Sequence, residues 1–78
     1  MWLEKKSPAR LEKRFEFNNY EKISAFMERL ENLCKKYDIY PNISFGKTFV
    51  SITLFLESEE TNLKFVEFSK VVDESYDF

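Results

Sequence analysis

The sequence predicts an α+β domain in which an antiparallel sheet of three to four strands carries two helices on one face. In several segments, hydrophobic residues alternate with a period of two, as they do in half-buried strands. In two other segments they recur every three or four residues, as they do in amphipathic helices. These segments follow one another in the order β-α-β-β-α, an order that suits helices packed against one side of an antiparallel sheet.

A chain of 78 residues has room for one small domain. Residues 1–10 are charged and show no hydrophobic period, so we interpret them as a lead-in to a single domain over residues 11–78. Trp2 in this lead-in either attaches the N-terminus to the domain or has no structural role. The core of so short a chain is thin, so a partner subunit would add to its stability.

The first strand is predicted over residues 11–17, where Leu11, Lys13, Phe15 and Phe17 alternate with acidic and basic residues. Asn18 then provides a candidate N-cap, with Glu21 in the reciprocal capping position. A helix follows from Tyr20 to Tyr37, and its apolar face consists of Ile23, Phe26, Met27, Leu30, Leu33, Cys34 and Tyr37.

Two more strands are predicted over residues 39–45 and 48–57, joined into a hairpin by a turn at Gly46 and Lys47. The longer strand places Val50, Ile52, Leu54 and Leu56 on one face. We expect these four residues to form the core together with Phe26, Leu30 and Leu33. A second helix should begin near Ser58, a candidate N-cap, and carry a broad apolar surface as far as Tyr76.

The composition excludes several kinds of site. There is no histidine, so Ser-His and Cys-His catalytic systems and histidine-containing zinc sites are ruled out. The single cysteine, Cys34, lies on an apolar helix face and is interpreted as a buried small hydrophobe. The acidic residues match no calcium loop, and one glycine cannot form a phosphate-binding loop. We therefore expect neither a metal nor a cofactor.

The same considerations limit the partners. A net charge of −2 argues against direct binding of nucleic acid by electrostatics. No apolar segment has the length of a membrane span or the form of a signal peptide, so a cytoplasmic protein is expected.

Self-association is predicted from the strand over residues 48–57, because large apolar side chains occupy both of its faces. Phe49 and Phe55 lie opposite the predicted core face, where one layer of helices would leave them in water. We expect a homodimer that extends the sheet across an edge strand and buries these rings. The second helix could then add a contact between dimers, giving a homotetramer.

A family resemblance adds to this interpretation. It is carried by Leu11-Glu12-Lys13-Arg14-Phe15-Glu16-Phe17, Tyr20, Ala25-Phe26-Met27, Tyr37-Asp38-Ile39-Tyr40-Pro41 and Val50-Ser51-Ile52-Thr53-Leu54. These segments resemble the pterin-4a-carbinolamine dehydratase family, without a gap from about residue 11 to residue 57 and loosely through the second helix. The resemblance implies the same β-α-β-β-α order. It also implies dimers formed through the sheets and, often, tetramers formed through the helices.

Members of that family dehydrate the 4a-hydroxytetrahydropterin left by aromatic amino-acid hydroxylases. Some animal members also act as dimerisation cofactors of a homeodomain transcription factor. The family's His-His-Pro or His-Asn-Pro run falls here on Ile39, Tyr40 and Pro41, and its third histidine falls on Glu57. Positions implied to lie near a pterin-like ligand are Lys35, Asp38, Tyr40, Pro41, Glu57 and Ser58.

These departures decide the expected function. The reaction needs groups that titrate near neutral pH. The usual pKa of histidine, ~6.5, meets this need, whereas the usual pKa values of tyrosine, ~10, and glutamate, ~4.3, do not. We therefore expect a catalytically inactive dehydratase-like protein retained for oligomerisation or for binding a protein or ligand. The alternative is an altered dehydratase that acts on a pterin through Glu57 and Tyr40. A third reading is a module that binds a pterin-like molecule in the same cleft without chemistry.

Overall fold

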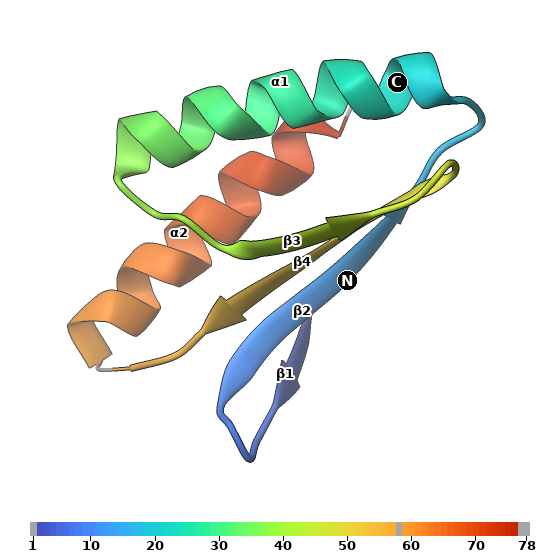
Figure 1. The fold of residues 1–78 in the computed structure, drawn as a ribbon. Coiled ribbons are helices and arrows are strands. Elements are labelled where there is room, and N and C mark those ends of the chain that lie inside the picture. Colours follow the sequence, from blue (N-terminus) through green and yellow to red (C-terminus); the bar gives the residue numbers. More distant parts are fainter. Residues whose placement is uncertain (1, 58, 77–78) are drawn as a thin grey trace.

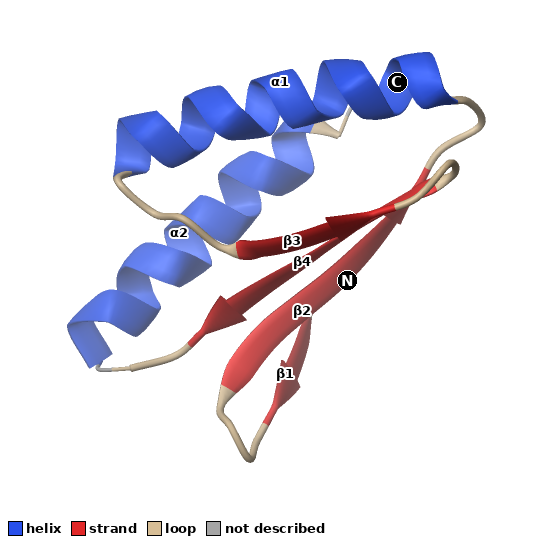
Figure 2. Ribbon diagram, in the orientation of Figure 1, coloured by secondary structure: helices blue, strands red, loops and turns tan. Residues whose placement is uncertain are grey.

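The computed structural model describes residues 2–57 and 59–76 of the chain. Its elements are β1 (Leu3–Lys5), β2 (Arg10–Glu16), α1 (Tyr20–Tyr37), β3 (Asn42–Phe45), β4 (Phe49–Phe55) and α2 (Glu59–Ser75) (Figure 1). The four strands form one antiparallel sheet in the order β1-β2-β4-β3. Both helices lie on the same side of this sheet (Figure 2). The predicted α+β architecture is thus confirmed.

The register of the two central strands places their apolar residues on the helix side. Phe15 of β2 is opposite Val50 of β4, and Leu11 is opposite Leu54. Residues that are directly opposite in an antiparallel pair share one face of the sheet, so these side chains form one continuous apolar layer. The other face of the sheet is uncovered by helices and carries four charged residues of β2, Arg10, Glu12, Arg14 and Glu16.

The helices close the core over that layer. The buried hydrophobic residues are Phe15, Phe17, Ile23, Phe26, Leu30, Cys34, Ile39, Val50, Ile52, Leu54, Phe68 and Val72. This set confirms five of the seven predicted core residues. Leu33 is only partly buried against the core, and Leu56 is half-buried because it follows the last residue of β4. Among the described residues, neither helix is long and apolar enough to cross a bilayer.

Several boundaries differ from the sequence-based expectation: β2 covers residues 10–16 rather than 11–17, and β4 covers residues 49–55 rather than 48–57. The lead-in over residues 1–10 contains β1, whose three residues are too few to show a period. The strand expected over residues 39–45 begins only at Asn42, since the chain must first leave α1 and pass Pro41. The N-cap of α1 is Asn19 rather than Asn18; its side chain accepts a hydrogen bond from the Lys22 backbone N–H at 3.0 Å.

Trp2 attaches the N-terminal segment to the domain, which settles the alternative left open by the sequence. Its indole N–H donates to Asp73 Oδ1 of α2 at 3.0 Å, and its ring meets Phe15 edge-on at 6.1 Å. The same carboxylate oxygen accepts from Lys13 Nζ at 2.7 Å. Lys13 occupies the helix side of β2, and Asp73 provides the partner for its charge there. We call Trp2, Lys13, Phe15 and Asp73 the N-terminal clasp.

Candidate functional site

The candidate site is a hollow of about 350 Å³ where α1 ends, β4 ends and α2 begins. It is lined by Asp38, Ile39, Tyr40, Pro41, Asn42, Thr53, Leu54, Phe55, Glu57, Lys64 and Phe65. The hollow thus brings together four of the six predicted ligand-contacting residues, which are separated by up to nineteen positions in the sequence. The close approach of these segments follows from the pairing of β3 with β4.

The end of α1 decides how Ile39 and Tyr40, the first two positions of the family's motif, are oriented. Asp38 adopts a left-handed conformation (φ 55°, ψ 44°), and its backbone N–H donates to the Cys34 carbonyl. The Ile39 N–H donates to the same carbonyl at 3.1 Å. This ending directs Ile39 into the core at 4% exposure, while Tyr40 projects outward at 70% exposure. At the two positions where the family has histidines, Ile39 therefore has no group that could transfer a proton, and the hollow does not enclose the Tyr40 hydroxyl.

The third family position lies at the end of β4. Glu57 is exposed. The altered-dehydratase hypothesis needs Glu57 to be enclosed in an apolar environment, because burial is what would favour its protonated form near neutral pH. The described geometry does not provide that burial. Ser58, the neighbouring candidate, lies outside the described residues.

Two of the hollow residues that were not predicted as ligand candidates come from α2. Lys64 and Phe65 come from α2 and supply an ammonium group and an aromatic side chain. The helical period of α2 placed Phe65 on an apolar face, but nothing in the sequence indicated which strand end that face would meet. With Asp38 and Glu57 added, the hollow combines two carboxylates, one ammonium group and aromatic side chains. Such a lining can hold a small polar molecule.

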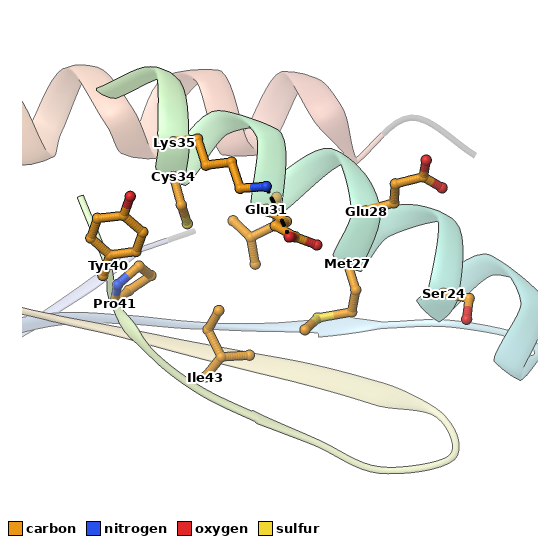
Figure 3. Close-up of a pocket in the computed structure, with 10 residues that line it drawn as sticks. Ser24, Met27, Glu28, Glu31, Cys34, Lys35, Tyr40, Pro41 and Ile43 are labelled. Atoms are coloured by element: carbon orange, nitrogen blue, oxygen red, sulfur yellow. Dashed lines mark ion pairs between the residues drawn. The ribbon is translucent and has the colours of Figure 1, made fainter. Parts of the chain in front are cut away.

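Lys35 lies in a different depression. A second groove of about 520 Å³ runs between α1 and β3, and Lys35 lines its edge on α1 (Figure 3). Lys35 Nζ forms an ion pair with Glu31 Oε1 at 3.2 Å, one turn earlier in the helix. Tyr40 and Pro41 line both the groove and the hollow and thus separate them. The structure therefore places Lys35 apart from the other ligand candidates.

The floor of this groove includes Cys34. Burial raises the pKa of the Cys34 thiol, and the negative charge of Glu31 adds to that effect. A thiol with a raised pKa is mostly protonated near neutral pH and is a weak nucleophile. Within residues 2–57 and 59–76, no group of three or more metal-ligating side chains could hold an ion.

The two interface candidates, Phe49 and Phe55, occupy opposite ends of β4 on the helix-free face. The Arg14 guanidinium lies over the Phe49 ring, 4.1 Å from its centroid. Phe55 is 42% exposed and also borders the hollow. Since β4 is an interior strand, a partner that paired only with a sheet edge would not lie directly over either ring.

The chain was compared with family models, curated proteins and solved structures. No family model matches it, and no curated protein is significantly similar to it. A solved structure described as a pterin dehydratase-like protein identified as a RuBisCO assembly factor in the alpha-carboxysome is 35% identical, with a TM-score of 0.85. The similarity covers 95% of this chain and 87% of that one. This chain belongs to the pterin dehydratase-like family.

A second structure, a transcriptional coactivator/pterin dehydratase from Brucella melitensis, is 15% identical with a TM-score of 0.81. It covers 97% of this chain and 82% of its own length, and at that identity it shows the shared fold alone. The resemblance noted from the sequence is thus confirmed. The same resemblance implies that Pro41 corresponds to the proline of the family's motif, and the sequence of this pterin dehydratase-like protein contains no histidine.

Proposed function

We propose that this pterin dehydratase-like protein is non-catalytic and works by binding another protein as an assembly factor. One observation carries the proposal: the three family histidine positions hold a buried isoleucine, an outward-pointing tyrosine and an exposed glutamate. A dehydratase must move a proton between the 4a-hydroxyl group and N5 of the pterin. Ile39 cannot take part, and Tyr40 and Glu57 lack the enclosure that would tune them for that step.

The partner class comes from the 35% identical structure. That protein is described as a RuBisCO assembly factor, so RuBisCO is the partner that we propose to test first. Assembly factors need an accessible surface rather than a catalytic centre, and this chain has several exposed large hydrophobic residues. They are Leu3, Tyr20, Tyr40, Ile43, Phe45, Phe55, Leu63, Val66 and Tyr76.

A specific observation favours a second candidate function, an altered dehydratase or a binder of a pterin-like molecule. The hollow gathers Asp38, Tyr40 and Glu57 beside Lys64, and these groups can hydrogen-bond a polar heterocycle. In this alternative Glu57 would act as the acid and Tyr40 as its hydrogen-bond partner. A pterin that binds without turnover would instead indicate a ligand-binding module.

Turnover of chemically generated 4a-hydroxytetrahydropterin separates these functions. We expect the purified protein to leave the rate at its spontaneous value, whereas a family member with intact histidines, run in parallel, accelerates it. Acceleration that disappears in Glu57→Gln would overturn the non-catalytic proposal and establish the altered enzyme. A thermal shift with a reduced pterin and no turnover would support the ligand-binding module.

Assembly activity is tested directly. RuBisCO subunits folded with and without this protein should differ in the yield of assembled enzyme, and the protein should co-purify with an assembly intermediate. No difference in yield, together with no co-purification, would remove RuBisCO as the partner. A homodimer or homotetramer remains part of this proposal, and the exposed residues on the helix-free face and on α2 offer surfaces for it.

A further inference from the structure

The helix-free face of the sheet carries two phenylalanine rings that neither helix covers. Phe49 and Phe55 lie at opposite ends of β4 on this face, and Phe55 is 42% exposed. Strand β4 lies between β2 and β3, and both helices lie on the other side of the sheet (Figure 2). A chain that pairs with a sheet edge would not reach these rings, so only a partner that lies flat on the face would cover both of them.

The charged residues of β2 alternate in sign along the same face. In chain order they are Arg10, Glu12, Arg14 and Glu16. Each arginine Nε lies 2.6 Å from a carboxylate oxygen of the glutamate two residues later, so the four residues form two ion pairs within the chain. The side chains of Arg14 and Glu16 are nevertheless 57% and 63% exposed. These groups thus have open sides on which a second charged partner can bind.

The sheet register arranges this face in four rows across β2 and β4. The opposite pairs are Arg10 with Phe55, Glu12 with Thr53, Arg14 with Ser51, and Glu16 with Phe49. Strand β3 extends the two middle rows with Asn42 and Ser44. The order along β4 is therefore ring, hydroxyl, hydroxyl, ring in either direction. Along β2, reversing the direction exchanges every positive charge for a negative one.

This pattern is complementary to itself. A two-fold axis that lies in the interface and runs across the strands turns the second copy end for end and stacks β2 on β2 and β4 on β4. Arg10 then faces Glu16 of the second copy. By the same rotation Glu12 faces Arg14, and the rings at the two ends of β4 face each other. Each charge meets the opposite charge, as a self-complementary two-fold interface requires.

Other occupants match this face less well. A two-fold axis along the strands would stack β2 on β4, and Glu16 would face the Phe49 ring instead of a cation. A nucleic acid would meet the carboxylates of Glu12 and Glu16. A protein surface with charges of one sign would be repelled by half of the charged residues on this side of β2. The alternation thus favours a second copy of this chain in the antiparallel orientation.

The size of the face limits the strength of such a contact. A sheet seven residues long and four strands wide measures roughly 23 Å by 19 Å, a flat area of at most about 440 Å² on each copy. Stable interfaces of standard size bury about 800 Å² on each partner. The contact therefore belongs to the weaker class, and we expect a dissociation constant in the micromolar range.

We propose that two copies of this chain stack their helix-free faces about a two-fold axis that runs across the strands. The ion pairs between copies join Arg10 to Glu16 and Arg14 to Glu12. The two sheets lie about 10 Å apart, as in a β-sandwich, and the rings at the ends of β4 close the interface. This inference rests on the self-association included in the proposed function and assigns the surface that mediates it.

Two charge-reversed variants test the pairing. Arg10→Glu with Arg14→Glu makes the charged row of β2 wholly acidic, and Glu12→Arg with Glu16→Arg makes it wholly basic. In sedimentation equilibrium, each variant alone should associate at least tenfold more weakly than the wild type, because like charges meet across the axis. An equimolar mixture of the two should regain the dimer mass. Wild-type affinity in the separate variants, or no association in the mixture, would overturn the proposal.

A matched control makes the same change of net charge away from this face. Lys36→Glu with Lys70→Glu reverses two exposed lysines, one on α1 and one on α2, and should associate as the wild type does. If this control dissociates as far as the acidic variant, net charge rather than pairing explains the effect, and the proposal fails. Circular dichroism checks that each variant is folded.

Cross-linking tests the orientation independently of the charges. Residue 10 of one copy faces residue 16 of the other, whereas the two copies of residue 10 are separated along the strands by roughly 20 Å. A short bismaleimide should therefore join Arg10→Cys to Glu16→Cys in a mixture, and neither variant to itself. The wild type, whose one cysteine is buried, is the control. Efficient joining of either variant to itself, or of Arg10→Cys to Phe55→Cys, would contradict the orientation.

Three outcomes separate this inference from the proposed function. If the wild type is a dimer that the charge reversals leave intact, the stacking is wrong although self-association stands. If the dimer responds as expected but the protein does not change the yield of assembled RuBisCO, the stacking stands and the assembly function fails. A wild-type mass of 9.5 kDa even at millimolar concentration would overturn the stacking and leave the binding of another protein untouched.

Discussion

The two edges of the sheet have opposite chemistry. At one edge, β1 is three residues long and contains Glu4 and Lys5, and Lys5 forms an ion pair with Glu12 at 3.0 Å. At the other edge, β3 has the sequence Asn-Ile-Ser-Phe and carries no charge. Short, charged edge strands discourage pairing with other chains, whereas an uncharged edge with apolar side chains invites it. The comparison indicates that β1 is the protected edge and β3 the receptive one.

The edges also differ in how the rest of the molecule supports them. The N-terminal clasp attaches the residue before β1 to both β2 and α2 through Asp73. Beside β3 the helices instead leave a groove. An edge that is held by its own side chains is closed to a partner, and an edge that borders an open groove has room for one. Four predictions test this difference, from the largest expected effect to the smallest.

Leu30→Ala should be the most destabilising change on the β3 side. Leu30 is fully buried beneath the groove, so its truncation leaves a cavity, and we expect a loss of about 2–5 kcal/mol in the free energy of unfolding. Urea unfolding followed by circular dichroism measures this loss. Leu63→Ala, at a side chain 73% exposed, is the control and should change stability by less than about 0.5 kcal/mol. Equal effects of the two variants would show that α1 does not direct Leu30 into the core.

Trp2→Ala should weaken the β1 side by about 1–3 kcal/mol, because it removes a partly buried ring and the hydrogen bond to Asp73. Trp2→Phe keeps an aromatic contact with Phe15 and loses only the indole donor, so its cost should be about 1 kcal/mol. Both values come from chemical unfolding followed by far-ultraviolet circular dichroism. If Trp2→Ala leaves the unfolding midpoint unchanged, the clasp does not hold this edge.

Phe55→Asp tests whether self-association uses the helix-free face rather than an edge. Phe55 is 42% exposed beside Arg10 on the neighbouring strand. A charge there should weaken a dimer formed through this face at least tenfold. Light scattering at micromolar concentration gives the mass. A wild-type mass of 9.5 kDa would exclude the dimer, and a dimer unaffected by Phe55→Asp would place the interface elsewhere.

Acid should weaken the β1 edge selectively, and this is the smallest effect. Hydrogen bonds from Arg10 and then from Lys5 hold the pKa of Glu12 below its ordinary value of 4.5. Because this pKa is depressed in the folded state, the stabilisation exists above the unfolded pKa and disappears as pH falls through the folded one. Glu12→Gln should therefore be slightly less stable than the wild type at pH 7, and the difference should vanish in acid. A difference that persists at low pH would contradict this charge assignment.

Local patterns in the sequence determined the architecture. The alternation around Phe15 and Val50 and the helical period through Phe26 and Leu30 predicted the core, because burying an apolar face is the largest favourable term available to such a chain. The resemblance likewise predicted that Ile39, Tyr40 and Glu57 occupy the positions of the family's histidines. That prediction was possible because all three residues lie within the segment that matches the family without a gap, from about residue 11 to residue 57.

Tertiary structure alone decided the orientation and the surroundings of the side chains at those positions. The left-handed conformation of Asp38 at the end of α1 turned the Ile39 side chain inward and the Tyr40 side chain outward. The pattern of residue types does not predict these orientations. The pairing of β3 with β4 brought the end of α1 to the end of β4, and α2 then supplied Lys64 and Phe65 to the hollow. Strand β1 became visible only through its pairing with β2, since three residues carry no period. The receptive edge at β3 depends on which strand ends the sheet, and strand order is set by contacts between residues distant in sequence.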